Sequence, residues 1–345
     1  GAEGENAFTN HDYTAYVQEL PKDQLDLIIR LESDRMVNLL VNDKAFKTEV
    51  EVVQNERRMR NENNPEGTMY QELYGNAYRS HSYRWPVIGY AEDLAAMSSQ
   101  DALDFYRRHY RPSLATIVVV GDVSTREVFS KIEKAYGAIP GTAPDGLAPL
   151  AAPSPEPAQT EIRRKNMPLH IQVEKLMVAY PVPQFDHADT PALRVLETLL
   201  CVGKSARLNR ALVESGLATS VECGAIDAKD PSIFFVGVSM QKGKHASQAE
   251  WMVQRELTQL GKKKIMEPEL ERTRNTMSFQ FYNSLDSGKE MAGFIGRYES
   301  ISSEGFPGGI RLLPKSLHVG ADELQSVSAK YFNPAARTII TGVPK

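Results

Sequence analysis

Two glutamates on one predicted helix are the residues best suited to chemistry. The sequence predicts a helix from about Ala45 to Arg60, and this helix carries Glu49 and Glu56 seven residues apart. At roughly 100° per residue, seven steps return a side chain almost to its starting direction, so both carboxylates lie on one face, two turns apart. One carboxylate could bind a cation while the other supports it. The alternative is a charged, solvated helix face, which the spacing alone favours.

Four segments, taken in order, resemble a known family. They are Asn-Ala-Phe-Thr at 6–9, the E-x6-E helix, H-x-Y-R at 81–84, and a Y-x-P turn at 110–112 followed by a predicted V-V-V-G-D strand at 118–122. Together they resemble the insulinase/pitrilysin family of zinc peptidases, in particular the short-subunit branch that includes mitochondrial processing peptidase and its bacterial relatives. The resemblance runs through nearly the whole chain and implies a zinc-dependent endopeptidase.

The zinc motif of that family is not present in this sequence. Family members carry an inverted H-x-x-E-H helix that supplies two zinc ligands and the general base. None of the seven histidines here forms a pair at the four-residue spacing that this helix requires. We therefore expect the motif in a longer parent, about 25 residues before Gly1. We expect the chain as given to hold no tightly bound catalytic zinc and to hydrolyse no peptide.

The resemblance assigns roles to residues of the first half. It places the family's third zinc ligand at Glu56, and at Glu49 a second carboxylate that orients the site without binding metal directly. It places Asn6, Ala7 and Phe8 in an edge strand that pairs with an extended peptide through main-chain hydrogen bonds. An ordinary loop-to-strand transition is the alternative for this segment. In the complete protein, two histidines and one carboxylate would leave the fourth zinc position open for the attacking water.

Two histidines in the matching segments are predicted to be structural. His81 and Tyr83 match an H-P-Y-like segment of the family, with Ser82 in place of the proline. A histidine beside aromatic residues more often packs or forms hydrogen bonds than binds a metal, so we expect this role for His81. We expect the same of His109, which precedes the Y-x-P turn.

The second half departs from the family in a second way. Family members that are active alone supply from this half an Arg and a Tyr, seven residues apart, that reach the substrate and the tetrahedral intermediate. The matching segment, 208–221, places Leu212 and Thr219 at these positions. Arg210 is two residues too early, which on a helix turns it about 200° away. The resemblance therefore implies the metal-bearing half of a heterodimer whose partner, of similar fold, supplies the Arg/Tyr pair. A homodimer is the alternative assembly.

Two other functions of the same fold remain open. One is a non-catalytic scaffold, like the family members that serve as core subunits of respiratory complexes. The other is a peptide-binding subunit that presents substrate to a catalytic partner. The retention of both Glu49 and Glu56 argues against each.

Composition excludes several classes of partner. The net charge is -4 and the pI is about 6.1, and the basic cluster of Arg57, Arg58 and Arg60 is local, so a nucleic-acid partner is not expected. No apolar run approaches the roughly 18 residues of a membrane span. The compartment is left open, with a slight preference for the bacterial periplasm over the cytoplasm or the mitochondrial matrix.

The length and the internal organisation indicate two domains. A chain of 345 residues is long for one core, and 139–168 is rich in proline and lacks helix or strand periodicity, which predicts a linker. The domains are therefore predicted at 1–138, which bears the metal ligand, and at 169–345.

The ends of the two halves also resemble each other. Residues 101–123 and 322–344 both read as a helix, a Tyr-to-Pro turn and a buried β-branched strand, which indicates a duplicated domain. We predict an α+β fold of two homologous domains, each with a mainly antiparallel sheet covered by long helices.

The two cysteines, Cys201 and Cys223, lie in apolar surroundings and outside any C-x-x-C pattern. A chain of this size needs no covalent crosslink, so we expect two unpaired buried thiols, with a disulfide as the alternative.

Overall fold

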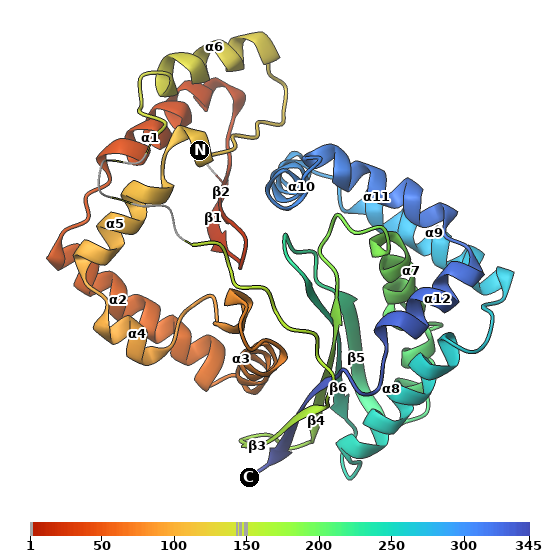
Figure 1. Ribbon diagram of the computed structural model, residues 1–345. Helices are drawn as coiled ribbons and strands as arrows, with labels where there is room; N and C mark the ends of the chain where they lie inside the picture. The colour runs from red at the N-terminus through yellow and green to blue at the C-terminus, as the bar shows by residue number, and fades with distance from the viewer. Residues whose placement is uncertain (1–2, 143, 145–146, 148–150) are drawn as a thin grey trace. The chain divides into compact units, whose positions relative to one another are not determined.

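The protein has the mixed α+β fold that its sequence predicts (Figure 1). The structure is a computed structural model that describes residues 3–142, 144, 147 and 151–345. The α-helices are α1 (Leu25–Asn38), α2 (Asp43–Arg57), α3 (Pro65–Ala77), α4 (Ala91–Ala96), α5 (Ser99–His109), α6 (Thr125–Tyr136), α7 (Thr190–Cys201), α8 (Ala246–Leu260), α9 (Glu267–Asn283), α10 (Gly288–Ile301), α11 (Phe306–His318) and α12 (Ala321–Tyr331). The strands are β1 (Glu3–Thr9), β2 (Thr14–Glu19), β3 (Arg163–Leu169), β4 (Lys175–Val182), β5 (Ala218–Ala225), β6 (Ser232–Met240) and β7 (Thr338–Pro344).

The chain separates into two compact units, each described here by itself. The first unit comprises Gly1–Arg58, Val87–Ala152 and Leu285–Ser300, and the second comprises Met59–Pro86, Pro153–Ser284 and Ile301–Lys345. Each unit therefore draws on both halves of the sequence. The domain boundaries 1–138, 139–168 and 169–345 stay a prediction, because a unit defined by contacts is not the same as a domain that folds alone.

A five-stranded sheet with the strand order β3-β7-β4-β6-β5 forms the centre of the second unit. All of its neighbouring pairs are antiparallel except β3 with β7, which is parallel. Side chains of β4 are buried on both faces of the sheet, with Tyr180 in one core cluster and Met177 in the other. Because side chains alternate along a strand, both faces of this sheet must be covered by other elements.

Helices supply that cover. The larger core cluster, on the side of Tyr180, contains side chains from α7, α8 and α12. On the other face, Met69 and Leu73 of α3 are fully buried in the cluster that includes Met177. The sequence predicts long helices at 190–201, 245–260 and 267–285, and they are present as α7, α8 and α9.

Part of the predicted linker belongs to the sheet. We expected 139–168 to lack strand structure, but β3 begins at Arg163 and pairs with β7 from Arg163 to Leu169. β3 is an edge strand, which tolerates polar residues and a proline such as Pro168 more readily than a central strand does. Because of these polar residues and the proline, the sequence of β3 lacks the alternation of apolar and polar residues that predicts a strand.

The first unit contains the β1–β2 hairpin and the helices α1, α2, α4, α5, α6 and most of α10. Its buried apolar side chains, among the residues that the structure describes, are Leu94, Tyr106, Val128 and Tyr298. The prediction of a buried V-V-V-G-D strand at 118–122 was wrong. No described residue pairs with this segment as a strand, and Val119 is 38% exposed. A β-branched run forms a strand only where a partner strand is present. Of the predicted repeat, both helices are found as α5 and α12, but only the second strand is found, as β7.

The prediction of two unpaired thiols was wrong. Cys201 and Cys223 form a disulfide, with their Cα atoms 5.8 Å apart. Cys201 ends α7 and Cys223 lies in β5, which α7 contacts. Tertiary packing brings the two sulfurs together, and the spacing of 22 residues could not indicate this.

Within the described part of the chain, no helix is long and apolar enough to cross a membrane.

Candidate functional site

Helix α2 carries Glu49 and Glu56 on one face, as their spacing predicts. The helix begins after Asn42, whose side-chain oxygen accepts a hydrogen bond from the N–H of Ala45 at 2.8 Å. Glu49 is exposed and Glu56 is partly exposed, so both carboxylates lie at the surface of this unit. Their roles as supporting carboxylate and zinc ligand stay predictions.

The residue after Glu56 fixes the end of α2. Arg57 is buried, and its Nε donates a hydrogen bond to the carbonyl oxygen of Gly89 at 3.1 Å. Since a helical backbone is rigid over one residue, this contact also fixes the direction in which Glu56 projects. Sequence reasoning treated Arg57 only as part of a local basic cluster and missed this role. Arg57 and Gly89 are 32 residues apart, so no local sequence pattern indicates this hydrogen bond.

The predicted peptide-binding segment forms β1, one strand of an antiparallel hairpin with β2. All seven residues of β1 are exposed, and Phe8, 45% exposed, packs edge-on against Tyr13 with ring centroids 6.0 Å apart. The sheet that contains β1 has two strands among the described residues, so the edge of β1 opposite β2 has no strand partner there. Asn6, Ala7 and Phe8 are therefore in an edge strand, and peptide binding by them stays a prediction.

His81 has the packing and hydrogen-bonding role that we expected. It is 4% exposed, and its Nδ1 accepts a hydrogen bond from the N–H of Tyr83 at 3.2 Å. Its Nε2 lies 3.4 Å from a carboxylate oxygen of Asp230, and its ring packs against that of Tyr83 with centroids 4.3 Å apart. The hydroxyl of Tyr83 in turn accepts a hydrogen bond from the N–H of Asp230 at 3.2 Å.

Glu156 holds the loop around His81, and sequence reasoning missed it. Its carboxylate accepts hydrogen bonds from the N–H groups of Arg79, Ser80 and His81 at 2.8 to 3.1 Å. Burial alone would raise the pKa of Glu156, but these hydrogen bonds, with the charge of Arg163, hold the pKa below its usual value. A single acid between prolines in the S-P-E-P sequence was the signal that could have found it.

His109 and Tyr110 lie at the end of α5. Partial burial, with the charges of Arg108 and Arg111, lowers the pKa of His109. Burial also raises the pKa of Tyr110, whose hydroxyl lies 2.7 Å from that of Tyr16 on β2. This hydrogen bond joins the hairpin to α5, and the ring of His109 packs against that of Phe105 with centroids 4.4 Å apart.

The segment that in the family supplies an Arg and a Tyr has Leu212 and Thr219 at these two positions. Leu212 lies in the π-helical turn Asn209–Val213 and is fully buried in the larger core. Thr219 lies in β5, and its hydroxyl donates to the carbonyl oxygen of Ser239 at 3.2 Å. Arg210 is exposed, and its charge acts on Glu269, whose pKa is lowered first by its hydrogen bond with Arg207. The segment forms a helical turn followed by a strand, so Leu212 and Thr219 do not share one helix.

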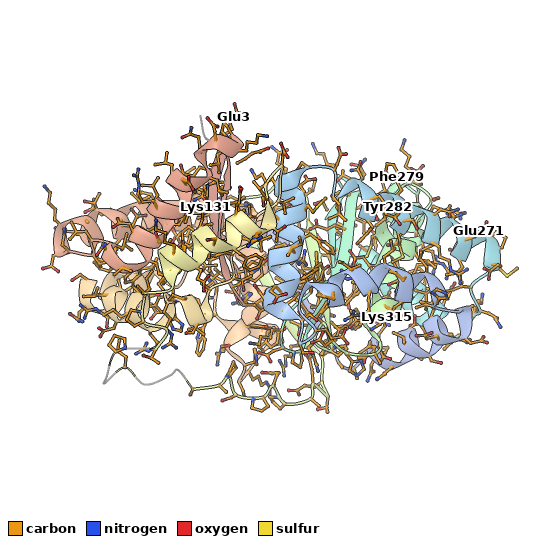
Figure 2. All side chains as sticks on the ribbon, turned by 90° about the horizontal axis from the view of Figure 1, so that it is seen from above. Glu3, Lys131, Glu271, Phe279, Tyr282 and Lys315 are labelled. Atoms are coloured by element: carbon orange, nitrogen blue, oxygen red, sulfur yellow. A yellow bond between two sulfur atoms is a disulfide. The ribbon has the colours of Figure 1, made fainter. Side chains whose placement is uncertain are left out.

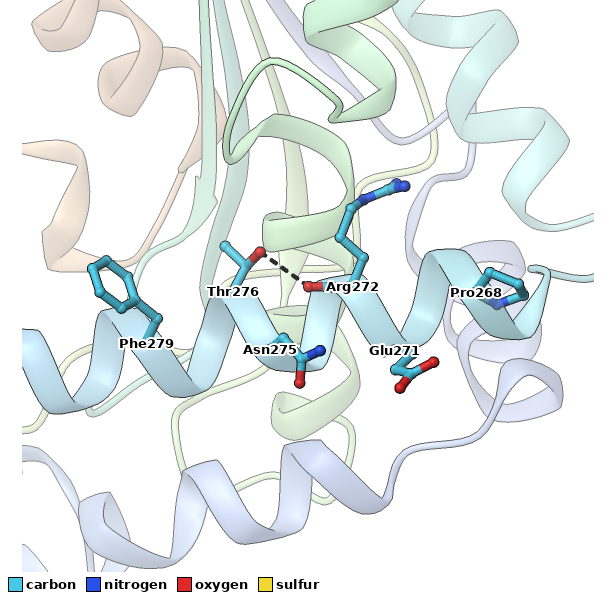
Figure 3. A pocket seen from close by; sticks show the side chains of 6 residues that line it. All are labelled: Pro268, Glu271, Arg272, Asn275, Thr276 and Phe279. Atoms are coloured by element: carbon cyan, nitrogen blue, oxygen red, sulfur yellow. Dashed lines mark hydrogen bonds between the residues drawn. The ribbon is translucent and has the colours of Figure 1, made fainter.

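A shallow pocket of about 480 Å³ lies along α9 in the second unit, and none of the residues predicted to be functional lines it. Figure 3 shows the six residues that line it, which all come from one face of this helix: Pro268, Glu271, Arg272, Asn275, Thr276 and Phe279. Phe279 and Tyr282 project from the same helix, 70% and 71% exposed (Figure 2). No acid–base pair converges on the described part of this pocket, so it does not resemble a catalytic site.

The described residues do not by themselves fit a zinc centre. A hydrolytic zinc site needs three protein ligands, and no three His, Cys, Asp or Glu side chains lie close enough to hold a metal ion in the part of the chain that the structure describes. Glu56 could supply one ligand only. No step of hydrolysis can therefore be assigned to these residues.

Comparison with known proteins gives matches along most of the chain. Residues 1–90 match the family model described as Insulinase (Peptidase family M16). Residues 96–277 match the model described as Peptidase M16 inactive domain. The two models meet close to α4, and together they span both units.

Individual proteins and structures agree with these models. The zinc protease PqqE of Helicobacter pylori is 27% identical over 338 residues, which is 97% of this chain and 75% of that protein. Cytochrome b-c1 complex subunit 1 of Bos taurus is 23% identical over 197 residues, 56% of this chain and 40% of that protein. The crystal structure of a protease from Helicobacter pylori superposes with a TM-score of 0.93 at 27% identity, covering 100% of this chain and 83% of that one.

Proposed function

Because this chain belongs to peptidase family M16, the insulinase family, we propose that it is the metal-bearing subunit of a zinc-dependent endopeptidase that cleaves short or unfolded peptides. The observation that carries the proposal is the pair Glu49 and Glu56, on one face of α2 within the region that matches the insulinase model. The name of the Helicobacter pylori relative, a zinc protease, supports the same activity class.

In this proposal Glu56 gives zinc one carboxylate ligand and Glu49 orients it. In the family the two histidine ligands and the general base come from an H-x-x-E-H segment, a motif that the given sequence does not contain.

The peptide would bind along β1. An extended segment can add to an exposed strand edge through main-chain hydrogen bonds, which are nearly blind to side-chain identity. Such pairing suits a peptidase of unfolded segments. β1 is exposed and its edge opposite β2 has no strand partner among the described residues, which supports this role for Asn6, Ala7 and Phe8.

A second subunit of the same fold would complete the active site by supplying an Arg and a Tyr. The burial of Leu212 and the hydrogen bond of Thr219 support this part of the proposal, because neither side chain can aim a donor at a developing oxyanion. The bovine relative, named as a subunit of the cytochrome b-c1 complex, gives a precedent for assembly of this fold into larger complexes.

That relative also supports the alternative function, a non-catalytic scaffold of the same fold. The description of the second matching model as an inactive domain favours it as well. The two functions differ in one measurable property, since a scaffold needs neither zinc nor the carboxylate of Glu56.

We propose further that the protein works in an oxidising compartment such as the bacterial periplasm. The disulfide between Cys201 and Cys223 supports this, because disulfides are rare in the reducing cytosol.

The peptide-docking part of the function is tested with a backbone substitution. Ala7→Pro removes the N–H of an edge-strand residue, and proline is tolerated where that group does not pair within the sheet. Binding of a short, unstructured fluorescent peptide should be lost in Ala7→Pro and retained in the matched control Ala7→Val, which keeps the N–H. Equal binding by both variants would place the peptide elsewhere than on β1.

A further inference from the structure

The hydrogen bonds of the β1–β2 hairpin show which backbone groups of β1 face away from β2. The N–H of Asn10 donates to the carbonyl oxygen of Tyr13 at 3.0 Å, which makes these two residues a hydrogen-bonded pair beside the turn. In an antiparallel ladder, hydrogen-bonded and non-hydrogen-bonded pairs alternate. The next pair, Thr9 with Thr14, is therefore non-hydrogen-bonded. Its side chains are close, as such pairs require, with the two hydroxyl oxygens 3.0 Å apart.

The same alternation places Ala7 in a non-hydrogen-bonded pair. Ala7 lies opposite Tyr16 and two residues from Thr9 along β1. Its N–H and C=O groups therefore point to the edge of β1 that no described strand occupies. These are the two groups that an incoming extended peptide would use for its central pair of hydrogen bonds.

The N–H of Ala7 already has a partner. The side-chain oxygen of the preceding residue, Asn6 Oδ1, accepts its hydrogen bond at 2.9 Å. A peptide that pairs with β1 must take this N–H and must therefore displace the Asn6 carboxamide. Both residues are exposed, so water can solvate the carboxamide once it has turned away.

We propose that Asn6 is a reversible cap on the peptide-docking edge of β1. The proposal rests on the function proposed above, and it adds a residue that regulates access to the same edge. The cap competes with every peptide for the N–H of Ala7, so a peptide that forms a single contact gains little. A peptide that pairs along several residues of β1 gains enough hydrogen bonds to displace the cap. The cap thereby favours long extended segments, and it also shields an exposed strand edge from other strands.

The test compares three forms of the chain for binding of a short, unstructured fluorescent peptide that lacks proline and charged residues. Asn6→Ala removes the competing acceptor and should lower the Kd about two- to tenfold, the net worth of one hydrogen bond. Asn6→Asp keeps an acceptor and adds charge, which strengthens the cap and should raise the Kd. In the peptide-free chain, hydrogen exchange of the Ala7 amide should be faster in Asn6→Ala than in the unaltered protein.

A matched control is Asn38→Ala, which removes another exposed carboxamide, one that donates to Asp34 on α1 at 2.8 Å. It should leave the Kd unchanged. If Asn6→Ala does not fold, Asn6→Val, with a side chain suited to strands, gives the same comparison.

The outcomes separate this inference from the proposed function. Peptide binding by the unaltered chain with an unchanged or higher Kd in Asn6→Ala would overturn the cap and leave docking on β1 in place. Absence of peptide binding in every form would overturn the proposed function, and the cap with it.

Discussion

Gly67 lies directly against the carbonyl oxygen of Arg60. A Cβ atom at position 67 would be 1.9 Å from that oxygen, a distance that no real contact reaches. The π-helical turn Arg58–Glu62, which follows α2, thus passes as close to the start of α3 as a glycine allows. Glycine is required at position 67 because the backbone of Arg60 approaches it too closely for any side chain.

Gly67→Ala should therefore destabilise the protein. The backbone must shift to remove the clash, and overpacking of this kind costs about 1 to 3 kcal/mol of the free energy of unfolding. The measurement is denaturant unfolding followed by circular dichroism. Gly75→Ala, within the same helix, is the matched control, because its Cβ would lie 3.9 Å from the nearest atom. It should stabilise the protein by up to about 1 kcal/mol through helix propensity. Equal effects of the two variants would contradict the close-approach argument.

The carboxylate of Glu156 should make stability depend on pH. The pKa of Glu156 is lowered in the folded protein, so its contribution is present above the unfolded pKa of about 4.3 and is lost as the pH falls through the folded value. Glu156→Gln should lower the free energy of unfolding by about 1 to 3 kcal/mol at pH 7, the worth of hydrogen bonds to a charged group. The difference from the unaltered protein should shrink toward pH 3.

Glu161→Gln is the control for that series. Glu161 forms an exposed ion pair with Arg79 at 2.7 Å, and such pairs contribute about 0 to 1 kcal/mol. A pH profile of Glu156→Gln parallel to that of the unaltered protein would show that the three N–H groups do not hold a charged carboxylate.

The disulfide between Cys201 and Cys223 should be present in protein purified without reductant. Mass spectrometry after alkylation should then find no free thiol. Cys201→Ser with Cys223→Ser should lower the free energy of unfolding by about 3 kcal/mol, as expected for a crosslink that closes a loop of this length. Alkylation of both cysteines in the unreduced, folded chain would contradict the pairing.

Leu212→Arg should fail to restore a catalytic arginine. Leu212 is fully buried in the larger core, so a charged side chain there should unfold the second unit rather than reach a substrate.

Activity should appear instead when the intact protein is mixed with a homologous subunit that carries the Arg/Tyr pair. Loss of one oxyanion donor typically costs about 10² to 10³ in turnover, so the protein alone should be nearly inactive. Full activity as a monomer or homodimer would show that another residue, such as Arg210, takes this role.

Local patterns predicted most of the elements because each depends on neighbouring residues. The helix that carries Glu49 and Glu56 and the strands β2, β4 and β6 have the periodicity of their type, and the structure contains them. The family was also accessible from the sequence, since its motifs are short and ordered along the chain, and the matching models confirm it.

Features that depend on distant residues could not be predicted. The disulfide needs α7 to pack on β5, and the edge strand β3 is defined only by its pairing with β7. The 118–122 segment shows the reverse case, in which strong strand propensity forms no strand because the described residues provide no partner. The hydrogen bond between Asn6 and Ala7 is local, but an exposed Asn has too many conformations for its sequence to indicate one.

The central claim is that Glu56 is a zinc ligand, and the zinc content of the intact purified protein tests it most directly. We predict one zinc per chain in the unaltered protein, loss of zinc in Glu56→Gln with the fold retained, and a smaller decrease in zinc affinity, on the order of 10- to 100-fold, in Glu49→Gln. An intact protein without zinc, or a Glu56→Gln variant that retains zinc as tightly as the unaltered protein, would contradict this account and favour the scaffold.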